Sequence, residues 1–249
     1  SVSQVRRESE MTMTGLVSFK DGSGQVSTVE LAAADAGRLV AGMPWRVFRW
    51  RRGQAHYSGW YWSSTAGGHV VYESRLELAR LLLADFDPRV AAIAAQPFSV
   101  SAEAGGRKRR HVPDFLLIGA DGAVSVVNVK PAGQLAVPEV ADALGWAAEV
   151  FASRGWRHEI WSGACAVVLA NVRFLAAYRF PGRVDAAAVA ELGRTVLGAV
   201  SIGEVEARFA GRFPVWVCRP ALLHLVWQGT FRAALDEPLS AATVLERAA

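Results

Sequence analysis

The feature that most constrains the fold is a pair of apolar runs joined by an Asp-Gly step. The first run covers residues 111–118 and the second covers residues 123–130. An Asp-Gly pair between two such runs is a strong signal for a β-hairpin. Side chains two positions apart on a strand share a face, so Asn128 and Lys130 point the same way and the hairpin brings Asp114 toward them. The sequence therefore predicts an acid, an amide and an amine in one cluster.

The segments that flank this hairpin predict an α/β domain with a mixed sheet. Apolar residues at spacings of three and four predict a helix over residues 71–83 and another over residues 138–153. Strands are expected near residues 90–100 and over residues 161–169, and a basic turn is expected over residues 105–110. The order of helix, strands, helix and strand is typical of an α/β core.

The N-terminal region contains two segments of different composition. Residues 16–26 predict a strand pair around an Asp-Gly-Ser-Gly turn and belong to an arm over residues 1–44. Residues 45–62 alternate aromatic and basic residues, which predicts two strands around a turn at residues 52–54. Aromatic side chains in a chain this apolar are more often core residues than a platform on which bases stack, so we expect a core role.

The C-terminal region predicts short helices followed by a β extension. Asp185 is expected to cap a helix that runs to about residue 200, and Ser201 to open a second one through residue 209. A third helix is expected over residues 214–228, with a strand pair or wing within residues 230–245. This layout is that of a winged helix-turn-helix module.

The cluster on the hairpin suits hydrolysis of a phosphodiester. Carboxylate oxygens hold a hard divalent cation, the cation polarises phosphate and acidifies a bound water, and a lysine stabilises the developing negative charge. Asp114 opens a buried strand, where an unpaired carboxylate is costly. Glu73 lies off the apolar stripe of the preceding helix and is free to face the same edge of the sheet. We therefore expect Glu73 to join the cluster.

A carboxylate on a helix, the step Pro113-Asp114 and a strand that ends in x-x-Lys130 together resemble the PD-(D/E)XK pattern of restriction-endonuclease-like nucleases. Within that group the chain resembles the TnsA-type transposon endonucleases, whose last motif has glutamine in place of the acidic residue. Asn128 occupies that position here. The resemblance extends from about residue 45 to residue 245, and it implies a restriction-endonuclease-like mixed sheet flanked by helices, with a C-terminal winged-helix-like domain.

The resemblance also implies roles for named residues. The expected catalytic residues are Glu73, Asp114, Asn128 and Lys130. The expected ligands of Mg²⁺ or Mn²⁺ are Glu73, Asp114, Asn128 and the carbonyl of Val129. The expected DNA contacts beside the site are Arg107, Lys108, Arg109, Arg110 and His111. The expected partners are DNA, a DDE transposase subunit and an ATPase regulator, and the expected reaction is cleavage of one strand at the transposon ends.

Other interpretations of these residues stay open. Asn128 is one methylene shorter than glutamine, so a catalytically weak or inactive DNA-binding or assembly module of the same fold is an alternative. A restriction, defence or repair nuclease is another. Glu77 is expected on a solvated helix face. His111 and His158 lack companions at metal-binding spacing, and His224 falls on an apolar helix, so all three are expected to be structural. Contact with substrate stays open for His111.

Composition limits the kinds of partner, cross-link and cellular location that are expected for this chain. The formal net charge is only +4, with a pI of about 9.4, which permits a polyanion partner without requiring one. Cys165 and Cys218 lie in apolar runs and are expected to be buried thiols, so a disulfide framework or zinc site is not expected. No stretch has the roughly 20 apolar residues of a membrane span, and we expect a cytoplasmic protein. The expected domains are residues 1–44, 45–180 and 181–249.

Overall fold

The computed structural model describes residues 15–46 and 57–248. These residues form two compact units. The first unit contains the residues up to Tyr61, His69–Glu77 and Val90–Ser162, and the second contains Trp62–Gly68, Leu78–Arg89 and the residues from Gly163 onward. The chain thus passes into the second unit ahead of the boundary expected near residue 181. Within the described ranges, no helix is both long and apolar enough to cross a membrane.

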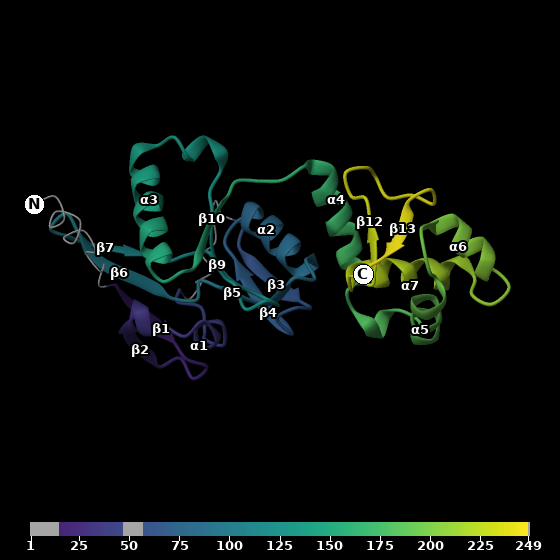
Figure 1. The fold of residues 1–249 in the computed structure, drawn as a ribbon, viewed down its shortest axis with the longest axis horizontal. Coiled ribbons are helices and arrows are strands. Elements are labelled where there is room, and N and C mark those ends of the chain that lie inside the picture. Colours follow the sequence, from purple (N-terminus) through teal and green to yellow (C-terminus); the bar gives the residue numbers. More distant parts are fainter. Residues whose placement is uncertain (1–14, 47–56, 249) are drawn as a thin grey trace, which may run out of the picture. The chain divides into compact units, whose positions relative to one another are not determined.

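One four-stranded sheet of the first unit draws half of its strands from the N-terminal region (Figure 1). The strands are β1 (Leu16–Lys20), β2 (Val26–Glu30), β6 (Ser99–Ala104) and β7 (Arg107–His111), in the order β2-β1-β6-β7. All neighbours are antiparallel. The predicted N-terminal strand pair is confirmed. The region expected as an arm therefore supplies β1, β2 and the short helix α1 (Ala36–Val40) to this unit.

The second sheet of this unit contains the predicted hairpin. Its strands are β5 (Val90–Ala95), β8 (Phe115–Gly119), β9 (Val124–Val129) and β10 (Arg157–Trp161), in the order β10-β9-β8-β5. The strands β5, β8 and β9 are antiparallel, whereas β9 and β10 are parallel. The sheet is therefore mixed, as predicted. A parallel pair needs a crossover, and helix α3 (Pro138–Ser153) supplies it between β9 and β10.

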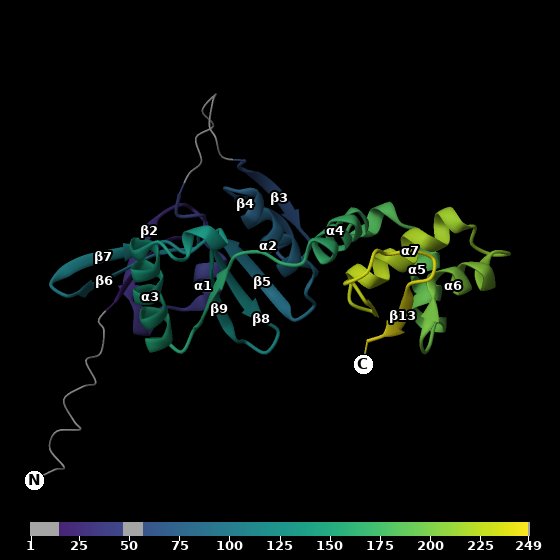
Figure 2. The ribbon, with the colours of Figure 1, turned by 90° about the horizontal axis from the view of Figure 1, so that it is seen from above.

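Helix α3 has the bounds that the sequence predicts. Proline at its first position lacks an N–H that the helix would leave unpaired, and its apolar stripe is long enough to define one face. This face joins both sheets in one core. Its largest fully buried members include Phe98, Leu116 and Phe151. In Figure 2 the helix lies beside strands β6 and β7.

Four expected elements are wrong in their bounds or type. Residues 71 and 72 belong to strand β4 (Gly68–Tyr72), which pairs with β3 (Gly59–Ser63), and helix α2 (Arg75–Phe86) begins only after them. Valine and tyrosine fit a strand as well as a helix stripe, so periodicity extended the helix too far. The single strand near residues 90–100 is two strands, separated by Gln96 and Pro97.

The other two errors concern a basic segment and a short apolar run. The basic turn is confined to Gly105 and Gly106, both with positive φ, and the arginines that follow form strand β7. The strand expected over residues 161–169 ends at Trp161, and helix α4 (Ala166–Leu175) follows. Short apolar runs do not distinguish the two states. Of the two strands expected around residues 52–54, the second falls on β3, which pairs with β4, while residues 47–56 lie outside the described residues.

The second unit contains the predicted C-terminal helices α5 (Ala186–Thr195), α6 (Ile202–Phe209) and α7 (Val215–Trp227). Strands β11 (Val200–Ser201), β12 (Phe231–Ala233) and β13 (Val244–Arg247) form a sheet in the order β11-β13-β12. Both predicted caps are confirmed. The Asp185 side chain accepts a hydrogen bond from the Ala188 N–H, and Ser201 forms a capping box with Glu204. Short 3₁₀ turns occupy Leu31–Ala33, Ala132–Gln134, Ala176–Tyr178 and Pro181–Arg183.

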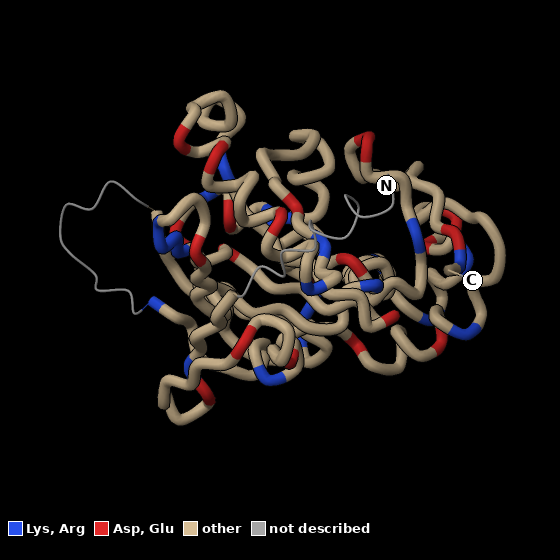
Figure 3. The backbone as a smooth tube through the Cα atoms, turned by 60° about the vertical axis from the view of Figure 1, so that its left-hand side comes forward, with Lys and Arg blue, Asp and Glu red and all other residues tan. Residues whose placement is uncertain are grey.

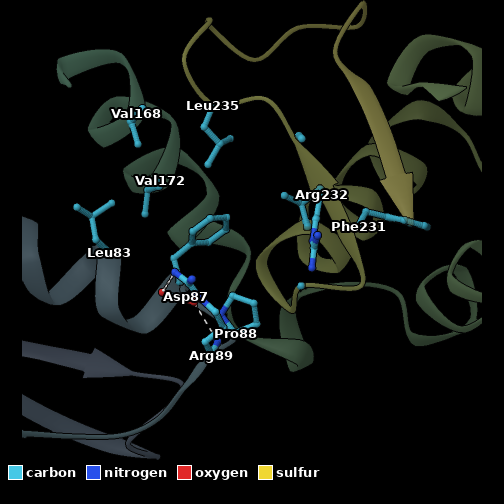
Figure 4. Close-up of a pocket in the computed structure, with 13 residues that line it drawn as sticks. Leu83, Asp87, Pro88, Arg89, Val168, Val172, Phe231, Arg232 and Leu235 are labelled. Carbon is cyan, nitrogen blue, oxygen red and sulfur yellow. Dashed lines mark hydrogen bonds and ion pairs between the residues drawn. The ribbon is translucent and has the colours of Figure 1, made fainter. Parts of the chain in front are cut away.

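A cavity of about 570 Å³ lies within the second unit. Figure 4 shows Leu83, Val168, Val172 and Leu235 around it, while Arg89 is held by Asp87 at 2.8 and 2.9 Å. The lining comes entirely from the second unit. The cavity therefore contains none of the residues expected to carry chemistry.

Candidate active site

The hairpin β8–β9 brings Asp114 against the end of β9. The Asp114 N–H donates to the Val127 carbonyl at 3.0 Å, which fixes the residue just ahead of β8. The Val129 N–H in turn donates to Asp114 Oδ2 at 2.7 Å. The Asp114 carbonyl accepts a hydrogen bond from the Gln96 N–H at 2.8 Å. The aspartate is thus held by backbone on both sides, as the predicted hairpin requires.

The structure also brings Asn128 beside Asp114. Asn128 is 1% exposed, and its Nδ2 lies 3.4 Å from Asp114 Oδ2. Its Oδ1 faces away from the aspartate and accepts hydrogen bonds from His111 Nε2 at 2.9 Å and from His158 Nε2 at 3.0 Å. His158 reaches Asn128 from the neighbouring strand β10. No local sequence pattern marks His158 as a partner of Asn128, because this contact depends on the parallel pairing of β9 and β10.

Lys130 follows directly after β9, and its N–H donates to the Trp161 carbonyl at 2.9 Å. Burial raises the pKa of Asp114, while the Val129 N–H and then the positive charge of Lys130 lower it. The charge of Lys130 also lowers the pKa of His111, an effect smaller than that of burial. The amine is therefore within electrostatic reach of the aspartate. The acid, amide and amine predicted from the hairpin lie together.

Glu77, expected on a solvated face, is buried at 9% exposure. Burial raises its pKa to about 7, the hydrogen bond from the Glu73 N–H opposes this, and the negative charge of Asp114 adds to the rise. Glu77 also caps helix α2. Its Oε2 accepts from the Glu73 N–H at 2.7 Å and its Oε1 from the Ser74 hydroxyl at 3.1 Å. The expectation of a solvated Glu77 is wrong, and the Ser-x-x-Glu capping pattern was the available signal.

Glu73 lies between β4 and α2 rather than on the helix. Its side chain is 32% exposed and lies 3.8 Å from the Arg46 guanidinium. The sequence predicted Glu73 on a helix over residues 71–83, but helix α2 begins two residues after Glu73. Of the two glutamates, Glu77 is therefore the one that shares a buried environment with Asp114.

The carboxylates of this cluster are few. Among the residues that the structure describes, no three His, Cys, Asp or Glu side chains are arranged to hold a metal ion. The carboxylate that acts electrostatically on Asp114 is that of Glu77, while the Asn128 oxygen faces the two histidines. Glu77 is buried and Asp114 is half-buried, and burial raises the pKa of both carboxyl groups, so a cation between them would be stabilised. The donor chemistry is thus compatible with Mg²⁺ or Mn²⁺.

The basic residues expected to contact DNA lie along β7, which is an edge strand of its sheet. Arg109 pairs with Asp142, and Arg110 donates to the Ser99 hydroxyl at 2.6 Å. Arg107 and Lys108 are exposed. Figure 3 shows Lys and Arg interspersed with Asp and Glu along the described backbone, so net charge does not mark a DNA-binding face. Contact between β7 and DNA would therefore depend on individual side chains rather than on a uniformly basic surface.

The remaining histidine and aromatic expectations have separate outcomes. His224 is buried in the second unit and its Nδ1 lies 2.6 Å from the Tyr178 carbonyl, so its expected structural role is confirmed. Tyr61 is buried, as expected for the aromatic run, whereas Trp60 is 62% exposed. Cys218 is buried as expected, and Cys165 is exposed, contrary to expectation, because it precedes α4 instead of lying inside a strand.

Residues 87–163 match the family model of the TnsA-like endonuclease N-terminal domain. This stretch is therefore similar to the N-terminal domain of TnsA-like endonucleases. The matched stretch contains Asp114, Asn128 and Lys130, together with both histidines that contact Asn128. It begins after helix α2, so it includes neither Glu73 nor Glu77, and it ends before the C-terminal helices. No curated protein matches the chain.

Proposed function

We propose that this TnsA-like protein is a metal-dependent DNA endonuclease of the PD-(D/E)XK kind that acts as a subunit of a heteromeric transposase. The observation that carries the proposal is the half-buried Asp114 of the matched stretch, which lies within electrostatic reach of the buried Glu77 and of Lys130. Buried carboxylates with perturbed pKa values, next to a fixed cationic side chain, are typical of catalytic sites. A purely structural hairpin has no need of this arrangement.

Asp114 and Glu77, with the Val129 carbonyl, are the groups that would hold Mg²⁺ or Mn²⁺. A divalent cation there supplies polarisation of a scissile phosphate and acidification of a bound water. Asp114 Oδ2 accepts the Val129 N–H, which fixes the orientation of the carboxylate. Lys130 stabilises negative charge that develops on phosphate. Glu73, predicted as a ligand, pairs with Arg46, so we assign the second carboxylate to Glu77 instead.

We further propose that the second unit ends in a winged-helix-like domain. The support is the element order α5, β11, α6, α7, β12 and β13, with a three-stranded sheet. Helix α7 would be the DNA-reading helix of such a domain, yet most of it is buried. Its Arg219 is bound by Glu206 at 2.5 and 2.7 Å. This favours contact with protein, for which a DDE transposase subunit or an ATPase regulator is the proposed partner.

A second candidate is an assembly module that keeps the fold without hydrolysis. The orientation of Asn128 favours it, because the amide oxygen faces the histidines and leaves two carboxylates. A nuclease that serves restriction, defence or repair would use the same residues. Only a partner-dependent assay separates these functions from one in transposition.

Nicking of supercoiled plasmid in Mg²⁺ or Mn²⁺, with and without a candidate transposase subunit, tests the proposal. We expect metal-dependent nicking by the wild type that Asp114→Ala and Lys130→Ala both abolish. Glu139→Ala, an exposed residue of α3, is the matched control for loss of a surface carboxylate. If no combination nicks while the chain still binds DNA or the partner, the assembly module replaces the nuclease.

A further inference from the structure

The side chain of Asn128 is fixed from both ends. Its oxygen accepts from two histidines at 2.9 and 3.0 Å, and its nitrogen is directed at Asp114 Oδ2. An amide oxygen has two lone pairs, so these two contacts use its full capacity. The amide oxygen therefore has no lone pair left for a cation.

The two rings are themselves held in place. His111 and His158 both pack against Phe151, with centroid separations of 6.3 and 5.4 Å, and Phe151 is fully buried. Because both rings present Nε2 to the same acceptor, each must donate from Nε2. A neutral histidine carries one N–H, so Nδ1 of each ring is then the unprotonated nitrogen.

We propose that His111 and His158 are positioning residues that hold the Asn128 amide with its nitrogen toward Asp114 and its oxygen away from the cation. This rests on the proposed function. Asp114 Oδ2 then receives two donors, the Val129 N–H at 2.7 Å and the longer contact from Asn128. Oδ1 accepts no hydrogen bond from the residues that the structure describes. We call this arrangement of His111, His158 and Asn128 the lock. It leaves Oδ1 of Asp114 as the oxygen that is free to face the cation.

The proposal gives Asn128 a role different from that of a shortened metal ligand. An aspartate or glutamate at this position would have no N–H to donate to Asp114 and would set a third negative charge beside two carboxylates whose pKa values are already raised. The neutral amide donates to one neighbour while it accepts from two others. An amide side chain can therefore make all three contacts of Asn128, which a carboxylate cannot.

The ring tautomers test the proposal without any need for cleavage. In the full chain labelled with ¹⁵N-histidine, two-dimensional ¹⁵N–¹H correlation through two and three bonds distinguishes the tautomers at a pH where the rings are neutral. His111→Gln and His158→Gln serve to assign the two signals. We expect the Nε2–H form for both histidines. The Nδ1–H form at either one would overturn the lock.

Donor position supplies a functional test on matched variants. The amide nitrogen of glutamine takes a place near Nε2 of histidine, whereas that of asparagine takes a place near Nδ1. We expect His158→Gln to nick plasmid about tenfold faster than His158→Asn, the size of effect typical of residues that orient metal ligands. Equal loss in both variants overturns the positioning role. If the wild type itself does not nick, the proposed function fails and the tautomers alone decide whether the lock exists.

Discussion

The two units bury polar side chains in different ways. In the second unit each buried group completes local structure: Asp85 accepts from Ser63 and Thr65 at 2.7 and 2.8 Å, and Asn171 bonds the backbone of residues 235–239. In the first unit, burial raises the pKa values of Asp114 and Glu77 despite their hydrogen bonds. Buried polarity alone therefore does not mark a site. The candidate site is distinguished by carboxyl groups whose hydrogen bonds do not offset the cost of burying their charge.

The largest expected effect on stability is in the second unit. Asp85→Ala would leave the hydroxyl and N–H donors of residues 63–65 without their acceptor, and we expect the free energy of unfolding to fall by about 3 kcal/mol. Urea unfolding measures the change. Asp85→Asn keeps one acceptor oxygen and should lose less. A loss no larger than that of the exposed cap variant Glu204→Ala would break the comparison.

Replacement of Glu77 should raise stability at high pH, whereas replacement of Asp85 lowers it. Its pKa is about 7 in the folded chain against 4.5 in the unfolded one, so the folded state binds the proton more tightly. Stability from this group is present below about pH 4.5 and is lost as the pH rises through 7, to an extent of up to about 3 kcal/mol.

Unfolding in urea at pH 5 and pH 8, without added metal, measures this dependence. Glu77→Gln keeps an acceptor for the helix cap, and we expect it to be less dependent on pH than the wild type and more stable at pH 8. A pH dependence that is the same in the variant and the wild type would place the titrating group elsewhere.

The sequence predicted those parts that depend on local chemistry. Helix α3 follows from a first-turn proline and a long apolar stripe, and Asp185 and Ser201 follow from capping. The hairpin follows from its turn, so Asp114 and Asn128 were predicted to meet. What local chemistry does not contain is burial decided by tertiary packing. Glu77 looked solvated, and His158 reaches Asn128 only through the sheet.

A smaller effect separates the two glutamates in activity. We expect Glu77→Gln to slow metal-dependent nicking by about 10- to 100-fold, because it removes a charged ligand from a site with few carboxylates. Glu73→Gln, which loses only a partly exposed pairing with Arg46, should change the rate by about twofold or less. Rates from plasmid nicking decide between them, and the reverse order would return the role to Glu73.

The smallest expected effect concerns DNA affinity along β7. Arg107→Ala combined with Lys108→Ala should lower the slope of log affinity against log salt by about 2, and it should do so for any sequence, because phosphate contacts release counterions. Fluorescence anisotropy with a labelled duplex at several salt concentrations measures it. Arg109→Ala is the matched control, since Arg109 pairs with Asp142. Equal slopes for all variants would remove this strand from the DNA interface.

The proposed catalysis requires that Asp114 and Glu77 together hold a cation. Thermal unfolding with and without millimolar Mn²⁺, in the presence of a short DNA duplex, tests it most directly, because a ligand that binds the folded state raises the midpoint. We expect a rise for the wild type and Glu73→Gln, and no rise for Asp114→Asn or Glu77→Gln. An equal rise in all four proteins, or none in the wild type, would contradict it.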